Sequence, residues 1–206
     1  NTRVIFTKEG KGAGYARNIG MKEAQGKWIM FADADDFFLP SAFDIIIEYI
    51  STNFDLVFFN TECRMSDNLN IKSHRMDSYI NGICKNDDNL LRYSFITPVL
   101  KLINSNIIKE HHQYFEEKPV SNDVYFSVRV GYYSKNIKKD LRPIRCRTER
   151  PDSLVNHEHT KQERIIRIET IFESQKFLNS IGMSKYCADG FKWYFGFHIR
   201  NVHDWL

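Results

Sequence analysis

The sequence predicts an α/β protein whose parallel sheet is covered by helices. Two observations support this. Strand and helix signals alternate through the first half of the chain, and the strand signals are continuous apolar runs, as expected of strands buried on both faces. The resulting order, βαβαβ, is typical of parallel strands joined by crossover helices. A length of 206 residues fits one well-cored domain.

The first two elements are separated by a glycine-rich loop. Val4 to Phe6 form the first strand signal, and the loop EGKGAG follows it. A helix is expected from Tyr15 to Ala24, with Gly26 at its end.

Two further strands and one helix complete the alternating half. The run KWIMFA at residues 27–32 has the length of a buried strand, and so does the run FDLVFFN at residues 54–60. Between them we expect a helix over residues 39–50, with Pro40 and Ser41 at its start.

The second half of the chain is mainly helical. Residues 61–83 are polar and irregular, which predicts a hairpin excursion. Helices are expected around three apolar positions, Leu90, Ile107 and Val124. From about residue 160 the chain is again mostly helix, and residues 161–182 are amphipathic with Gly182 as the stop.

Composition excludes several classes of protein. The chain is 42% hydrophobic and 27% charged, and no apolar run is long enough to cross a bilayer. Lys and Arg outnumber Asp and Glu by only 29 to 26, so we expect no nucleic-acid partner. Four cysteines without a C-x-x-C pair indicate neither a zinc site nor a disulfide framework, which favours a reducing, cytoplasmic location.

Three carboxylates follow the second strand signal. Asp33, Asp35 and Asp36 lie where ligands bind in open α/β sheets, beyond the carboxyl end of a strand. Anions packed this closely repel one another unless a cation compensates, and a divalent ion held by one or two carboxylates and by substrate phosphates would do so. The alternative is a solvated turn that caps the next helix.

The segment GAGYARNIG contains no known nucleotide-binding motif. Arg17 occupies the place of the third glycine in G-x-G-x-x-G, and no G-K-[ST] follows at the spacing of a P-loop. We interpret the segment as a helix start where Arg17 and Asn18 meet an anion. The alternative is that Arg17 only pairs with a surface carboxylate.

Together these residues resemble the inverting family 2 glycosyltransferases of the GT-A fold. The ordered features are A-R-N at residues 16–18, Gly26, the apolar strand, D-x-D-D at residues 33–36, and Pro40 at the next helix. The resemblance implies that Asp35 binds Mn or Mg, that Asp33 contacts the metal or the nucleotide ribose, and that Asp36 supports them.

The resemblance extends to an acceptor-side segment. Lys101-Leu102, Phe115 and Asn122-Asp123 stand at the family's K-L, F and E-D positions, so Asp123 is the implied general base. Asn122 departs from the pattern, and Asp123 therefore loses a like-charged neighbour that would raise its pKa. The alternative is that Asp123 only caps the following helix.

A basic segment resembles the loop that closes over the donor diphosphate. Arg147, Arg150 and Ser153 are the matched positions, and the planar guanidinium suits phosphate. A solvated basic loop or a contact with anionic lipid are the alternatives. We expect His157 and His159 to lie outside the metal shell.

The resemblance covers roughly residues 4–156. We expect a GT-A catalytic domain over residues 1–156 that lacks the first strand of the fold, and a helical extension of the same domain over residues 157–206. A preceding segment is expected in the natural gene. For the helix at residues 191–206, packing against the domain, dimerisation and peripheral attachment at the inner face of a membrane are the alternatives.

The resemblance implies transfer of a sugar from a nucleotide-sugar donor to a hydroxyl of a glycan or lipid-linked acceptor. A UDP-sugar is the expected donor because it is the most frequent one in the family. Inversion, dependence on Mn or Mg, and a place in surface polysaccharide biosynthesis are implied by the resemblance. The alternatives are a metal-dependent nucleotidyltransferase or phosphohydrolase, and a GT-A-like binding domain without catalysis.

Overall fold

A computed structural model describes residues 2–7, 10–150 and 159–186 of the chain. Within them a five-stranded sheet has the order β1-β4-β3-β5-β2. In that order the strands are β1 (Trp28–Met30), β4 (Lys101–Asn104), β3 (Leu56–Met65), β5 (Ile137–Glu149) and β2 (Phe37–Phe38). The α/β class predicted from the sequence is confirmed.

The sheet is mixed, so the expected parallel sheet is wrong in detail. Strands β3 and β5 pair in parallel, whereas β4 pairs antiparallel with both β1 and β3, and β2 pairs antiparallel with β5. An apolar run reports burial on both faces but not the direction of the strand, and β4 returns from the helical excursion in the opposite sense.

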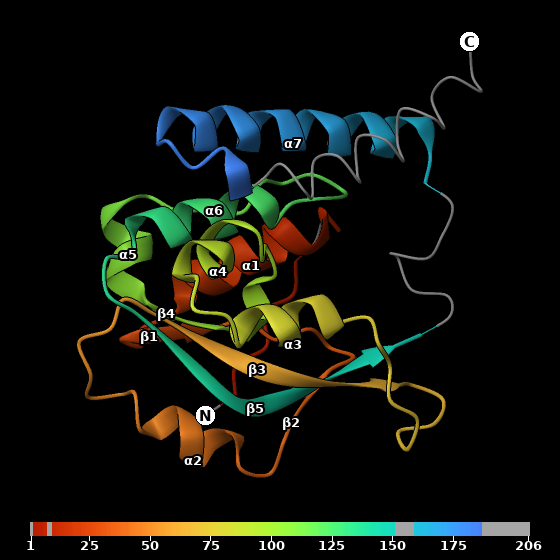
Figure 1. Ribbon diagram of the computed structural model, residues 1–206. Coiled ribbons are helices and arrows are strands. Elements are labelled where there is room, and N and C mark those ends of the chain that lie inside the picture. The colour runs from red at the N-terminus through yellow and green to blue at the C-terminus, as the bar shows by residue number, and fades with distance from the viewer. Residues whose placement is uncertain (1, 8–9, 151–158, 187–206) are drawn as a thin grey trace.

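Helices cover both faces of the sheet (Figure 1). The helix α2 lies on one face, and the others lie on the opposite side, with α7 as an outer layer over α6. The helices are α1 (Gly12–Glu23), α2 (Ala42–Ile47), α3 (Asp77–Ile83), α4 (Asp88–Tyr93), α5 (Ser105–Glu110), α6 (Val124–Tyr133) and α7 (Lys161–Ser180).

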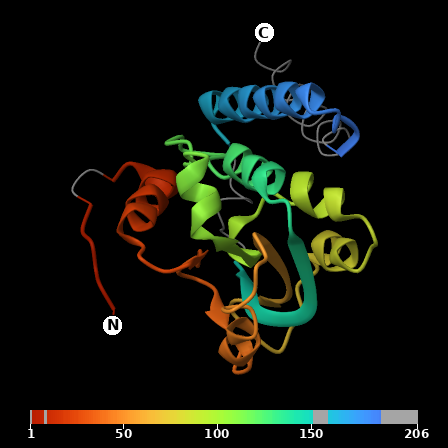
Figure 2. The ribbon, with the colours of Figure 1, turned by 90° about the vertical axis from the view of Figure 1, so that its left-hand side faces the viewer.

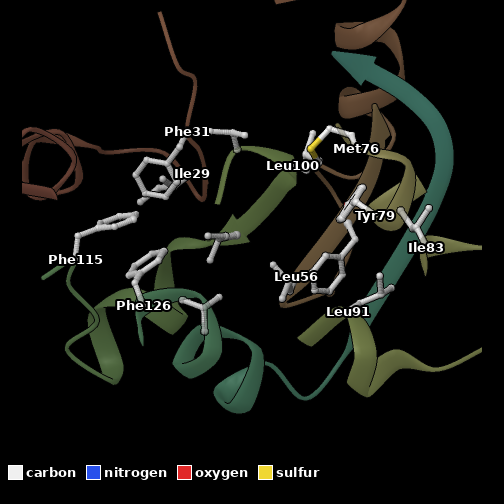
Figure 3. Close-up of a cluster of buried hydrophobic side chains, with 14 of the residues drawn as sticks. Ile29, Phe31, Leu56, Met76, Tyr79, Ile83, Leu91, Leu100, Phe115 and Phe126 are labelled. Carbon is white, nitrogen blue, oxygen red and sulfur yellow. The ribbon is translucent and has the colours of Figure 1, made fainter. Parts of the chain in front are cut away.

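Strand β3 separates two apolar cores. Leu56 and Phe58 point into the larger core below α3, α4 and α6, and Val57 and Phe59 point into the core beneath α2. All four side chains are fully buried, which explains the continuous apolar run in the sequence. Figure 3 shows part of the larger core, where aromatic rings gather near the end of β1.

The first predicted strand is wrong. Val4 to Phe6 pair with no described strand and are exposed. Figure 2 shows this N-terminal segment extending away from the sheet. Three apolar residues are too few to distinguish a strand from an extended tail.

Two other boundaries differ from the predictions. Helix α1 begins at Gly12 rather than Tyr15, so Arg17 lies in its second turn and its backbone N–H is inside the helix. The irregular segment predicted for residues 61–83 is shorter than expected, because β3 continues to Met65 and α3 begins at Asp77. The helices expected around Leu90, Ile107 and Val124 are present as α4, α5 and α6.

The long helix α7 is confirmed, but its buried side is polar. It begins with a capping box between Thr160 and Glu163 and ends before Gly182, whose φ of 72° suits a residue without Cβ. Its four buried residues are Arg164, Thr170, Ser174 and Leu178. The predicted amphipathic character is therefore present only in part: Leu178 packs with Tyr93 and Val128 in an apolar cluster, while the other buried residues of α7 are polar.

The predicted boundary between residues 156 and 157 and the helix at residues 191–206 fall outside the described residues. In the part that is described, no helix has the length and apolar character needed to cross a membrane.

Candidate active site

A cavity of about 1020 Å³ opens beyond the end of β1. Its walls come from α1, from the turn at residues 33–36, from residues 119–124 ahead of α6, from the end of β5, and from α3, α4 and α7. Most of the predicted site residues line it: Arg17, Asp33, Asp35, Asp36, Asp123, Arg147 and Arg150.

The acidic turn is fastened to strand β5. The Asp36 N–H donates to the carbonyl of Asp33 at 3.3 Å, which closes the turn. The Thr148 N–H donates to Oδ1 of Asp36 at 3.1 Å, and the Thr148 hydroxyl donates to the carbonyl of Asp35 at 2.7 Å. These contacts turn Asp36 inward, where its side chain is 3% exposed, while Asp33 and Asp35 reach the cavity.

Guanidinium groups compensate the charge of the turn. Arg17 Nη2 donates to Oδ1 of Asp33 at 2.9 Å, and Arg150 Nη2 donates to Oδ2 of Asp35 at 2.9 Å. Arg147 Nε lies 3.4 Å from Oδ2 of Asp36. The alternative of a merely solvated turn does not fit the structure, since each carboxylate faces an arginine.

Arg145 supports the turn from within the protein. Its side chain is 1% exposed, its Nη2 donates to the carbonyl of Phe31 at 2.8 Å, and its guanidinium lies 4.7 Å from the ring centroid of Phe38. Burial lowers the pKa of Arg145, and burial raises the pKa of Asp36 against the opposing influence of Arg147.

Arg17 joins the acidic turn to the acceptor-side segment. Besides Asp33 it contacts Asn122, donating from Nη1 to Oδ1 at 3.0 Å. Helix α1 approaches that segment closely because Gly14 has no side chain: a Cβ there would lie 2.2 Å from the carbonyl oxygen of Glu116.

Asn18, expected to bind the donor, is not among the residues that line the cavity. Its Nδ2 donates to the carbonyl of Phe115 at 2.9 Å, and its Oδ1 accepts from the Phe115 N–H at 2.8 Å. This two-way contact occupies the amide and fixes α1 to the chain that leads to Asp123.

Asp123 occupies the N-cap position of α6, yet its side chain makes no capping hydrogen bond. Capping alone therefore does not explain the residue, and its carboxylate faces the cavity. Two residues earlier, Ser121 has a φ of 56°, a left-handed conformation that is uncommon for serine. Burial raises the pKa of Asp123, whereas the charges of Arg17 and Lys101 lower it.

Lys101 is a buried cation beneath the site. Its side chain belongs to β4 and is 1% exposed, and its Nζ donates to the carbonyl of Phe95 at 2.9 Å. Burial lowers the pKa of Lys101 to about 7, and the nearby charge of Asp123 opposes this. The sequence pattern identified Lys101 as part of a motif but gave it no role.

The basic segment is only partly a loop. Arg147 lies within β5 and Arg150 follows it directly, which corrects the expectation of a loop at Arg147. Ser153 and His157 lie outside the described residues. His159 is described and does not line the cavity.

The oxygen atoms of Asp33 and Asp35 are hard ligands of the kind that Mg²⁺ and Mn²⁺ prefer, and both face the cavity. Across the described residues, no group of three His, Cys, Asp or Glu side chains is arranged to hold a metal ion. The residues therefore fit an ion that takes one or two carboxylates and completes its shell with donor phosphates.

The fold and the matched motifs define a GT-A glycosyltransferase fold. Residues 1–112 match the model of the glycosyl transferase family 2. The chain belongs to this family, as its sequence motifs indicated.

Curated relatives share the family over short stretches. An uncharacterized glycosyltransferase of Haemophilus influenzae is 30% identical over 64 residues, which are 30% of this chain and 22% of that protein. One of Rickettsia felis is 38% identical over 56 residues, 27% of this chain and 9% of its own length.

Solved structures share the fold over most of the described chain. The S. aureus TarS fragment 1–349 in complex with UDP-GlcNAc has a TM-score of 0.60 at 15% identity, covering 79% of this chain and 47% of that one. S. aureus TarS has a TM-score of 0.60 at 17% identity, covering 82% and 28%. This chain therefore spans less than half the length of these relatives.

Proposed function

We propose that this protein transfers a sugar from a nucleotide-sugar donor to a hydroxyl group of a glycan or lipid-linked acceptor. One observation carries the proposal: the acidic turn and Asp123 face the same cavity and are joined through Arg17. A donor held at the turn thus lies in the same space as a carboxylate able to take a proton. Membership in family 2 supports the same activity.

The donor is proposed to be a UDP-sugar, with its diphosphate near Asp33 and Asp35. A divalent Mn or Mg ion on these carboxylates would neutralise the leaving diphosphate. Arg147 and Arg150 are placed to bind phosphate oxygens through planar guanidinium groups. The TarS structure with UDP-GlcNAc supports this choice of donor by likeness of fold.

Asp123 is proposed as the general base. It would accept the proton of the acceptor hydroxyl while the oxygen attacks the anomeric carbon and the bond to the nucleoside diphosphate breaks. A single displacement of this kind inverts the anomeric configuration. The raised pKa of Asp123 suits the role, because a carboxylate with a higher pKa is a stronger base.

A role in surface polysaccharide biosynthesis is part of the proposal, and its test begins with the donor. Nucleotide sugars are screened for thermal stabilisation of the complete protein with and without Mn²⁺. We expect stabilisation by one UDP-sugar that grows with Mn²⁺, followed by transfer to a hydroxyl acceptor with inverted configuration by NMR. Release of pyrophosphate or free phosphate without glycoside formation would refute it, and donor binding without turnover would identify a binding domain.

A further inference from the structure

One face of α7 forms the wall of the cavity opposite the acidic turn. Glu163, Arg167, Ile171 and Ser174 all line the cavity, and their spacing of four, four and three residues puts them on one side of the helix. Figure 1 shows α7 as the outermost layer, across α6 from the sheet.

The acidic residues on this side of the cavity are already engaged. Glu163 forms the capping box with Thr160. Asp87 accepts hydrogen bonds from the backbone N–H groups at the start of α4 and from the Tyr186 hydroxyl.

The cations on this side have no ionic partner within the described residues. Lys85, Arg167 and Lys185 line the cavity and form no ion pair with any residue in the described part. Nε of Arg167 is buried and donates to no described acceptor. A buried guanidinium nitrogen without an acceptor costs free energy that an anionic ligand would recover.

The cations that line the cavity therefore fall into two groups, those paired with a carboxylate and those without an ion pair in the described residues. At the turn, Arg17, Arg147 and Arg150 face aspartates, whereas Lys85, Arg167 and Lys185 on the other side do not. We propose that this cationic wall binds a phosphate group of the acceptor, with Arg167 as the principal contact. The inference rests on the proposed glycosyl transfer, since it concerns the second substrate of the same cavity.

The test compares Arg167→Gln with Lys176→Gln in the complete protein. Both substitutions remove one positive charge from α7, but Lys176 is 73% exposed, pairs with Glu173 and does not line the cavity. The probes are maltohexaose carrying phosphate monoesters and unmodified maltohexaose, measured calorimetrically with UDP and Mn²⁺ at saturation so that the donor end is filled.

We expect Arg167→Gln to weaken binding of the phosphorylated probe about five- to tenfold, as loss of a charge-assisted hydrogen bond does, with a smaller salt dependence. Unmodified maltohexaose and UDP should bind the variant as they bind the parent protein, and Lys176→Gln should change nothing. Equal binding of both probes to the parent protein, or an unchanged affinity in Arg167→Gln, would overturn the inference.

Two further arms separate the related outcomes. Vesicles containing a polyprenyl phosphate replace the soluble probe: loss of binding to both in Arg167→Gln shows that the wall recognises phosphate itself, and loss for the phosphorylated maltohexaose alone shows that it recognises phosphate on a glycan and not in a lipid. UDP titration of the same sample tests the proposed function separately. If UDP binds and the phosphorylated probe does not, only the cationic wall is refuted; if the probe binds and no nucleotide sugar or UDP does, the proposed glycosyl transfer is refuted and the cationic wall is not.

Discussion

Lys101 allows a direct test of what it costs the protein to bury a charged side chain beneath the site. Its ammonium group is fully buried, its pKa is lowered from the ordinary 10.5 to about 7, and its nearest hydrogen-bond acceptor is the carbonyl of Phe95. Replacing Lys101 with Met keeps an unbranched side chain one heavy atom shorter and removes the charge. We expect the Lys101→Met protein to be more stable than the parent at pH 7.

The magnitude follows from linkage. The difference between 10.5 and about 7 corresponds to about 5 kcal/mol of unfolding free energy lost while the lysine is charged. Because the folded pKa is the lower one, the unfolded chain binds more protons between these pH values, and stability rises with pH. The penalty is full below pH 7 and disappears above about 10.5. Leaving the Phe95 carbonyl unsatisfied costs about 1–3 kcal/mol, so a net gain of about 2–4 kcal/mol remains while the lysine is charged.

The assay is urea unfolding of both proteins between pH 6 and pH 10. The advantage of Lys101→Met should shrink as pH rises, and the exposed Lys138→Met should show no such trend. Removal of the cation should also raise the pKa of Asp123 further, moving the acidic limb of the transfer rate to higher pH. A variant less stable than the parent at every pH would show that the hydrogen bond outweighs the buried charge and would refute the reasoning.

Three other substitutions test the site. Asp35→Ala should abolish Mn²⁺-dependent stabilisation by the donor, measured by thermal shift. The unfolding free energy should change by less than about 1 kcal/mol, since the ion pair of Asp35 is exposed. Persistent Mn²⁺ dependence would exclude Asp35 as a ligand. Asp123→Asn should keep donor affinity in calorimetry and lower the transfer rate by about two to four orders of magnitude. Near-normal turnover would show that Asp123 is not the general base and only stands at the start of α6. Gly14→Ala should lower unfolding free energy by about 1–3 kcal/mol in urea because its Cβ meets the Glu116 carbonyl, and a neutral result would mean that α1 shifts freely.

The sequence predicted the elements whose signals are local. The runs around β1 and β3, the acidic turn and the helices from α4 to α7 all appear near their expected positions. Each depends on apolar spacing, a cap or a helix stop within a few residues. Strand β4 was not predicted; it lies between β1 and β3 and runs antiparallel to both, and for that reason the wholly parallel arrangement was wrong.

Strand β5 was missed because its sequence is charged. Of its residues, Lys138, Lys139 and Arg142 are typical of a solvated segment, and only its pairing with β3 makes it a strand. The burial of Arg145 likewise depends on the carbonyl of Phe31, more than a hundred residues earlier. Contacts of this kind leave no periodic signal in one sequence.

The ion pairs of the acidic turn suggest how the site exchanges partners. The pair of Arg150 with Asp35 is exposed, at 58% and 41% of the two side chains, and pairs of this kind contribute about 0–1 kcal/mol. The pair of Arg17 with Asp33 is less exposed, at 19% and 31%, and Arg17 also donates to Asn122. Under the proposed function, breaking the exposed pair of Asp35 with Arg150 would therefore free Asp35 for a metal ion at little cost, whereas moving Arg17 would break two contacts. Arg17 thus holds the turn and the acceptor-side segment together.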